Sequence, residues 1–394
     1  MTLRTSVGII GAGPAGLFLS HLLHRAGIES VVLENRSRDY VERRVRAGVL
    51  EHAAAGLLRD SGAGSRMDQE GLPHRGVYLQ FDGSRHHLDF VRLTGRGIVV
   101  YGQQEVVKDL IDARLAAGGE ILFEAEAHGV EVDREGATVT FTHGGAEEHL
   151  DCDYCVACDG AHGVGRKALL ARGARSYERE YPHAWLGLLA RTPPIADELV
   201  YAYHERGFAL HSMRSPDISR LYLQVGRDAT LDEWPLDRIW PELRARLGEP
   251  DLREGEVLEL GISQMSSFVM EPMQDGHLLV AGDAAHIVPP TGAKGMNLAL
   301  ADVTVLAGAL ADRYRTGSTK RLESYTTDCL HRLWRAEYFS TFMTQLLHRQ
   351  SPGDMFEHHL HLAQLSHVTS SDAAATALAE NYTGAATEGV TLGV

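Results

Sequence analysis

Basic clusters are missing from this 394-residue sequence, although charged residues are common. Lysine and arginine total 38 against 53 aspartates and glutamates, for a formal net charge of −15 at pH 7, and the charges are spread along the chain. This balance disfavours attraction to a nucleic-acid backbone or to an acidic membrane surface. We therefore expect neither nucleic acid nor membrane among the partners.

Long apolar runs and a leader pattern are also missing. No apolar run approaches the roughly 18 residues that span a bilayer, and Met1 to Arg4 leads straight into a strand-like stretch without a signal-peptide pattern. We expect a cytoplasmic protein.

Cysteine is scarce, with four residues in all. Cys152, Cys155 and Cys158 have a spacing that resembles an iron–sulfur ligand run, but their segment reads as a strand, where buried cysteine behaves as a small hydrophobe. The histidines of residues 357–361 lack an acidic or cysteine partner at ligand spacing and read as a solvated helix face. We expect no metal site.

The sequence does contain a nucleotide-binding fingerprint. Residues 6–10 predict a strand, residues 17–26 a helix and residues 30–34 a second strand. Between the first two, Gly11 permits a tight turn, Gly13 lets backbone amides approach a pyrophosphate, and Gly16 lets helix and strand pack closely. With Ala15 in the turn and Glu34 placed to bind a ribose diol, we predict a dinucleotide site; the alternative is a tight turn without ligand.

The remaining pattern predicts an α/β (α+β) fold. Expected elements are a strand pair at 77–88, a helix at 104–117, a hairpin at 129–143, strands at 150–157 and 278–281, strands and turns at 185–225, and helices from 297 to 382. We expect a discontinuous Rossmann-like domain (1–72, 97–178 and 268–345), a β-rich substrate domain (73–96 and 179–267) and a helical C-terminal region (346–394).

One predicted hairpin carries a candidate anion site. If residues 215–217 begin its turn, a register that pairs Ser212 with Tyr222 places five side chains on one face: Leu210, Ser212, Arg214, Arg220 and Tyr222. Two arginines on that face require an anion. Arg214 can pair with a carboxylate through two hydrogen bonds, supplemented by the hydroxyls of Ser212 and Tyr222. The alternative for each residue singly is an exposed strand position.

Several further motifs carry a family resemblance. They are residues 44–50 (RVRAGVL), 100–103 (VYGQ), 158–160 (CDG), 281–286 (AGDAAH) and 286–297 (HIVPPTGAKGMN). From about residue 7 to residue 382 the chain resembles the single-component flavoprotein aromatic hydroxylases. The resemblance implies bound FAD, NAD(P)H and O2 as co-substrates, a homodimer, and conversion of 4-hydroxybenzoate to 3,4-dihydroxybenzoate.

The resemblance also assigns positions. It implies FAD or donor contacts at Glu34, Arg44, Arg46, Ala47, Gly48, Val49, Gln103, Asp159, His162, Arg220, Asp283, Met296 and Asn297. It implies that Tyr201 binds the substrate phenol with the carbonyl of Pro290, that Tyr382 and His74 relay the phenol proton, and that Thr291 lines the pocket. Since residues 292–297 lead into a helix, their amides would stabilise negative charge on the reduced flavin; the alternative is a capped surface helix.

Two departures concern the nicotinamide donor. Asn35 and residues 36–40 replace a segment associated with the NADPH 2′-phosphate, and Ser266 stands where a donor-binding arginine is expected. Arg36 and Arg38 could still grip a phosphate, but the losses favour NADH or dual use. A hydroxylase for 3-hydroxybenzoate or 4-aminobenzoate, or a non-catalytic flavin protein that senses aromatic acids, remains an alternative.

Overall fold

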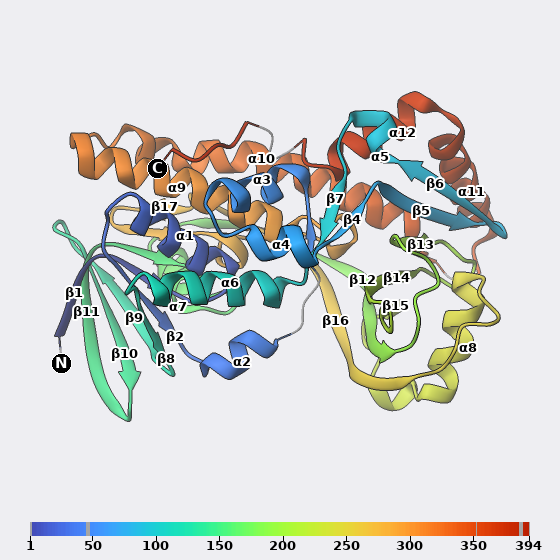
Figure 1. Ribbon diagram of the computed structural model, residues 1–394, viewed down its shortest axis with the longest axis horizontal. Helices are drawn as coiled ribbons and strands as arrows, with labels where there is room; N and C mark the ends of the chain where they lie inside the picture. Colours follow the sequence, from blue (N-terminus) through green and yellow to red (C-terminus); the bar gives the residue numbers. More distant parts are fainter. Residues whose placement is uncertain (1, 45–47, 352, 386–388, 394) are drawn as a thin grey trace.

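The computed structural model describes residues 2–44, 48–351, 353–385 and 389–393. Its first sheet has the central order β17-β18-β11-β1-β2-β8. The strands are β1 (Thr2–Ile10), β2 (Ser30–Glu34), β8 (Glu120–Phe123), β11 (Ala146–Ala157), β17 (Gln274–Asp275) and β18 (Leu278–Val280). A hairpin of β9 (Glu126–Val132) and β10 (Ala137–His143) extends from β11. Figure 1 shows this sheet in the left half of the molecule.

Helices cover the first sheet, and its central strands β1 and β11 are buried at their carboxyl ends. All five residues of β2 are buried, as expected of a parallel strand covered on both sides. The covering helices are α1 (Pro14–Arg25), α6 (Gln103–Ala116), α7 (Val164–Ala171) and α9 (Gly295–Thr316). Within the described residues, α9 alone is long and apolar enough to cross a membrane, but 72% of its most apolar window is buried, as in a core helix.

The second sheet forms the right half of Figure 1 and has the order β19-β16-β12-β15-β14-β13-β5-β6. Its strands are β5 (Gly76–Phe81), β6 (Ser84–Asp89), β12 (Arg175–Arg191), β13 (Val200–Ala202), β14 (Ala209–Ser215), β15 (Ile218–Gly226), β16 (Glu256–Glu271) and β19 (His286–Ile287). One face packs on α8 (Leu236–Leu247). Strands β12 and β16 pair from Arg175↔Glu271 to Arg191↔Glu256, so both cross the expected domain boundaries.

A small sheet and the C-terminal helices join the two halves. The small sheet comprises β3 (Val49–Leu50), β7 (Ile98–Val100) and β4 (Leu72–His74). The C-terminal helices are α10 (Lys320–Leu347), α11 (Met355–Ser370) and α12 (Asp372–Tyr382). Shorter pieces are α2 (Arg38–Arg43), α3 (His52–Asp60), α4 (Ser65–Glu70), α5 (Phe90–Thr94), η1 (Leu231–Glu233), η2 (Gly282–Ala284) and η3 (Pro290–Gly292). Side chains of α10, α12 and β3 share one apolar cluster with the second sheet.

The structure confirms the main predictions of helices and strands and corrects the reading of one helix face. The strand at 30–34 has the predicted bounds, and the helices expected from 297 to 382 are α9 to α12. The histidines of residues 357–361 do not form a solvated face, because His361 is buried and His358 lies 3.0 Å from the Tyr203 hydroxyl. His358 and His361 pack against Tyr203 of the β-rich half, whereas His359 is exposed.

Candidate active site

Three of the sequence motifs meet at one edge of the first sheet. Strands β1, β11 and β18 are neighbours and parallel, with Ile10 opposite Ala157 and Ala157 opposite Val280. Their carboxyl ends therefore lie together, and each runs directly into a motif: Gly11, Asp159 and Asp283. This edge of an open parallel sheet is the usual place for a bound nucleotide.

The glycines of the first turn have different physical roles. Gly11 has φ +103°, and a Cβ there would lie 2.5 Å from the carbonyl oxygen of Cys158. A Cβ on Gly16 would lie 2.0 Å from the Gly11 oxygen, so both glycines are needed for close packing. A Cβ on Gly13 meets no atom within 4 Å, which leaves open space beside the N-terminus of α1. Such a helix terminus suits a phosphate.

Glu34 is fixed beside this turn. Its Oε2 accepts a hydrogen bond from the Ala12 amide at 2.8 Å, and its Oε1 accepts one from the Arg36 amide at 2.9 Å. Helix α1 begins after Gly13 without a side-chain cap, so its first amides, including that of Ala15, are available to a ligand. The residues present therefore fit a dinucleotide.

The other two motifs are held by hydrogen bonds between a side chain and the backbone. The Oδ2 atom of Asp159 accepts a hydrogen bond from the Gly165 amide at 2.9 Å, and burial raises the pKa of Asp159. The Asp283 side chain is exposed, while Arg166 donates to the carbonyl oxygens of Asp283 at 2.5 Å and Ala284 at 3.0 Å. The sequence reading missed Arg166, which holds the Asp283 turn in place.

Asn297 ties two loops together at the start of α9. Its Nδ2 donates to the carbonyl of Val49 at 2.9 Å, and its Oδ1 accepts from the Glu51 amide at 3.0 Å. The adjacent Lys294 ammonium forms a buried ion pair with Glu51 and donates to the Tyr382 carbonyl at 3.1 Å. Helix α9 starts without a side-chain cap beside Met296, so its N-terminal dipole remains available to a negatively charged group.

The other expected cofactor positions vary in exposure. Gly48 is in close contact with the VYGQ motif, since a Cβ there would lie 1.9 Å from the Tyr101 oxygen. Gln103 begins α6 and is half-buried, whereas Arg44 and His162 are exposed. Arg46 and Ala47 lie outside the described residues.

A row of paired residues crosses the second sheet on the face that packs against α10, α12 and β3. Tyr201 pairs with Leu210, Leu210 with Tyr222, and Tyr222 with Gly187. A Cβ on Gly187 would lie 3.0 Å from the Tyr222 ring, so glycine leaves room for that ring. The predicted register is wrong by two residues, because Ser212 pairs with Arg220 and not with Tyr222. A shift of two preserves the face, as predicted.

Arg214 differs from its neighbour Arg220. The Arg220 guanidinium pairs with Glu259 at 2.9 Å and donates to the Tyr222 hydroxyl at 3.2 Å, so it already has an anion. Arg214 occupies an extra position in β14, between the pairs at residues 213 and 215. Its buried Nε and Nη1 atoms have no hydrogen-bond partner among the described residues, and burial lowers its pKa. Of the two, Arg214 is therefore the one whose charge has no anionic partner among the described residues.

Two tyrosines meet at the other end of the row. The hydroxyls of Tyr201 and Tyr382 lie 2.5 Å apart, both side chains are buried, and burial raises the pKa of each. The carbonyl of Pro290 accepts from the Ala293 amide at 2.9 Å in the neighbouring turn. The Thr291 hydroxyl is buried against α10, 2.9 Å from that of Thr344.

The structure does not bring His74 into hydrogen-bond contact with these tyrosines. It is buried, which lowers its pKa to about 4, and neither ring nitrogen has a partner among the described residues. Without the resemblance, the sequence alone would make His74 a surface histidine. The structure shows that reading to be wrong, because His74 ends β4 and its side chain is buried.

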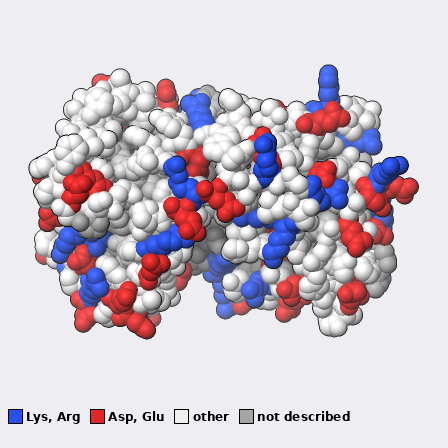
Figure 2. Space-filling view, turned by 180° about the vertical axis from the view of Figure 1, so that it is seen from behind, with Lys and Arg blue, Asp and Glu red and all other residues white. Residues whose placement is uncertain are grey.

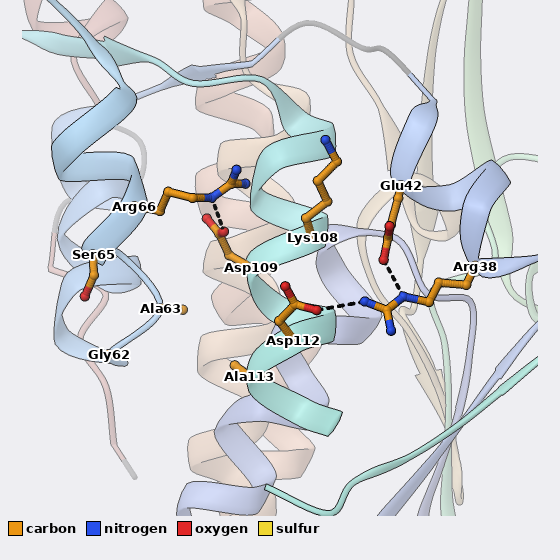
Figure 3. A pocket seen from close by; sticks show the side chains of 10 residues that line it. All are labelled: Arg38, Glu42, Gly62, Ala63, Ser65, Arg66, Lys108, Asp109, Asp112 and Ala113. Carbon is orange, nitrogen blue, oxygen red and sulfur yellow. Dashed lines mark hydrogen bonds and ion pairs between the residues drawn. The ribbon is translucent and has the colours of Figure 1, made fainter. Parts of the chain in front are cut away.

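A separate hollow of about 390 Å³ lies among α2, α4 and α6 (Figure 3). Arg38 lines it, but its guanidinium contacts Glu42 at 2.5 Å and Asp112 at 2.8 Å. Arg66 on the opposite wall pairs with Asp109 at 2.7 Å. The cations of this hollow are therefore matched by carboxylates. Figure 2 likewise shows acidic and basic side chains interspersed over the rear face.

Comparison with known proteins decides the family. The model of the FAD binding domain family matches residues 4–340. A p-hydroxybenzoate hydroxylase from Acinetobacter baylyi is 45% identical over 388 residues, which is 97% of this chain and 96% of that protein. The chain belongs to the p-hydroxybenzoate hydroxylase family.

Solved structures of other oxygen-inserting enzymes share the fold. A p-nitrophenol 4-monooxygenase from Pseudomonas putida DLL-E4 superposes with a TM-score of 0.83 at 18% identity, covering 97% of this chain and 98% of that one. An anhydrotetracycline hydroxylase from Streptomyces rimosus gives a TM-score of 0.77 at 23% identity, covering 97% and 76%. The FAD-binding monooxygenase fold thus extends over nearly the whole chain.

Proposed function

We propose that this chain adds one hydroxyl group to 4-hydroxybenzoate at carbon 3, using FAD, NAD(P)H and O2. The balanced reaction consumes one proton and gives 3,4-dihydroxybenzoate, NAD(P)⁺ and water. The observation that carries the proposal is the row from Tyr201 to Tyr222, with the unpaired guanidinium of Arg214 at one end and paired tyrosine hydroxyls at the other. A phenol with a para carboxylate matches both ends.

The binding step follows from the geometry of the sheet. With strands about 4.8 Å apart, Tyr201 and Tyr222 are separated by roughly 10 Å across two strand spacings, room for one aromatic ring. Arg214 would bind the carboxylate through two parallel hydrogen bonds, with Ser212 and Tyr222 as further donors. The desolvation cost of the buried Arg214 is then offset only when the acid is bound, which favours acids over neutral phenols.

The proton step belongs to the opposite end. Tyr201 would hydrogen-bond the substrate hydroxyl, and Tyr382, whose hydroxyl lies 2.5 Å from that of Tyr201, would accept the proton in turn. The resulting negative charge on the phenol oxygen increases electron density at the ortho carbon. FAD supplies the redox chemistry when bound, because it takes hydride from the nicotinamide and activates O2. His74 would be the outer member of this relay.

FAD would lie across the edge where the three motifs meet. The pyrophosphate would bind at the N-terminus of α1 beside Gly13, and Glu34 would bind the ribose. The α9 N-terminus and its neighbour Val49 would contact the ring system at the junction with the second sheet. Further contacts are proposed at Arg44, Arg46, Ala47, Gly48, Gln103, Asp159, His162, Arg220, Asp283, Met296 and Asn297.

For the donor, we propose that NADH serves at least as well as NADPH. Arg38 is held by Glu42 and Asp112, so a 2′-phosphate would have to compete with two carboxylates for it. Ser266 and Asn35 supply no cation. Initial rates with each nicotinamide on one preparation test this, and a strong preference for NADPH would contradict it.

The function is tested by turnover of the purified, FAD-loaded protein. We expect nicotinamide oxidation to accelerate with 4-hydroxybenzoate more than with 3-hydroxybenzoate or 4-aminobenzoate, with little hydrogen peroxide. Acceleration by 4-hydroxybenzoate with peroxide as the sole oxygen product would identify the acid as an effector. Binding of acids without any oxidation would support the sensor alternative.

We further propose a cytoplasmic homodimer. Large exposed apolar side chains occur on α10 and α11, among them Tyr338 at 66% and Phe356 at 79% exposure. Apolar side chains of this size on neighbouring helices are typical of subunit interfaces. Light scattering should give twice the chain mass, and a monomer at micromolar concentration would contradict the proposal.

A further inference from the structure

His348 lies at the end of α10, where the helix meets the second sheet, and it is fully buried. The indole Nε1 of Trp185 donates a hydrogen bond to its Nε2 at 2.7 Å. Its Nδ1 lies 3.0 Å from the carbonyl oxygen of Thr344. The imidazole thus bridges β12 of the substrate sheet and the last turn of α10.

The two partners fix the protonation state of this ring. A carbonyl oxygen can only accept, so Nδ1 must carry the proton, and an indole can only donate, so Nε2 must offer its lone pair. His348 is therefore a neutral imidazole in a single tautomer. Burial lowers its pKa well below the usual value, which agrees with this geometry.

Packing holds the ring in one plane. His183 stacks on it at 4.5 Å with an interplanar angle of 14°, and Phe208 stacks on it at 4.5 Å with an angle of 29°. Trp185, whose indole is bonded to His348, lies 4.9 Å from the Tyr222 ring. Tyr222 is one of the residues proposed to bind the substrate carboxylate, so the imidazole acts on that end of the pocket through a single side chain.

We propose that His348 is a positioning residue: its neutral imidazole fixes Trp185 against Tyr222 and thereby sets the carboxylate end of the substrate pocket. The proposal rests on the proposed function, since it assumes that 4-hydroxybenzoate binds at Arg214. His348 is also linked to the loop before α9, because the hydroxyl of its partner Thr344 lies 2.9 Å from that of Thr291.

The first test is a double-mutant cycle on the FAD-loaded enzyme. His348→Phe keeps a stacking ring but leaves the indole N–H buried without a partner, which should weaken 4-hydroxybenzoate binding about tenfold. In a Trp185→Phe background the donor is gone, so the same substitution should weaken binding no more than about twofold. The dissociation constant is read from the substrate-induced change in flavin absorbance. Equal losses in the two backgrounds, or no loss in either, would overturn the proposal.

A matched control is available on the other face of the ring. His183 is buried and stacks on His348, but neither of its ring nitrogens has a hydrogen-bond partner among the described residues. His183→Phe should therefore keep the stacking and leave the dissociation constant within about twofold of wild type. A loss as large as that of His348→Phe would mean that stacking, and not the bond to Trp185, positions the pocket.

Two conservative variants decide the matter if His348→Phe does not fold. In His348→Gln the amide oxygen reaches the Nε2 position and can accept from the indole. In His348→Asn the amide reaches only the Nδ1 position, which leaves the indole unpaired. We expect near-normal affinity and kcat for the first, and a raised KM with a smaller change in kcat for the second. Equal affinities would refute the proposed role.

Wild-type titration separates the two proposals. If wild-type holoenzyme fails to bind 4-hydroxybenzoate, the proposed function is wrong. If it binds while the His348 variants match it, only the positioning role is wrong.

Discussion

Replacing Arg214 should move stability and binding in opposite directions. The Nε and Nη1 atoms of its guanidinium are buried without a hydrogen-bond partner among the described residues, and Arg220 nearby adds a second positive charge. Arg214→Met replaces this buried, uncompensated polar group with an apolar side chain that is also long and unbranched. The free energy of unfolding of the substrate-free enzyme should therefore rise by about 1–3 kcal/mol.

Substrate binding should weaken by a larger amount. Losing one partner of a buried, hydrogen-bonded charge pair costs about 2–5 kcal/mol, which corresponds to roughly 30-fold or more in the dissociation constant. Arg214→Lys keeps the charge but offers a single point of contact, so its loss should be intermediate. Arg220→Lys is the comparison, because Arg220 already pairs with Glu259 at 2.9 Å.

The assay combines urea unfolding of substrate-free holoenzyme with a flavin absorbance titration by 4-hydroxybenzoate. If Arg214→Met destabilises the enzyme by more than about 1 kcal/mol, Arg214 already has a stabilising partner in the substrate-free enzyme, and the reasoning is refuted. If it binds substrate as wild type does, the carboxylate lies elsewhere.

Four further substitutions test other parts of the molecule. Tyr201→Phe should leave flavin reduction largely intact but uncouple it from product, and normal coupling would refute the relay through Tyr382. Gly13→Ala should fold normally yet bind FAD at least tenfold more weakly, because a Cβ there meets no protein atom; Gly16→Ala, whose Cβ would lie 2.0 Å from the Gly11 oxygen, should fail to fold. Burial lowers the pKa of His183 to about 4, below its unfolded value of about 6.5. Burying the neutral imidazole therefore costs no stability above pH 6.5, but the free energy of unfolding falls by about 3 kcal/mol as the pH is lowered toward 4. Urea titrations at both pH values should show a smaller fall in His183→Phe than in wild type.

The local sequence pattern was sufficient to predict the nucleotide-binding edge of the first sheet. The strand, glycine turn and helix around Gly11 are specified by adjacent residues, and parallel pairing then brings Asp159 and Asp283 to the same edge. The role of Arg166 could not be predicted, because its partners are the backbone carbonyls of Asp283 and Ala284, more than a hundred residues away. A backbone carbonyl leaves no residue-specific pattern in the sequence.

The substrate face was predictable only in part. Alternation along the hairpin predicted the face correctly. The turn contains only Pro216 and Asp217, one residue fewer than the predicted register requires, and Arg214 takes an extra position in β14, so that together they shift the register by two. A bulge of this kind re-aims one side chain, and no local composition announces it. The pairing of Arg220 with Glu259 is non-local, so the sequence could not show which arginine is free for a ligand.

Burial of histidines was the least predictable feature. His74 and His348 are polar residues in segments without strong periodicity, and their surroundings come from elements far along the chain. The bond from Trp185 to His348 joins residues 163 positions apart. Such a contact follows from how α10 lies on the sheet, which is a property of the packed molecule.

The position of the new oxygen atom tests the central claim most directly. If one pocket holds the acid at Arg214 and the phenol at Tyr201, turnover under ¹⁸O₂ must place a single labelled hydroxyl at carbon 3 of 4-hydroxybenzoate, with one product molecule formed per nicotinamide oxidised. Mass spectrometry and chromatography of the product measure both quantities. A label at carbon 2, or oxidation that yields only labelled peroxide, would contradict the account.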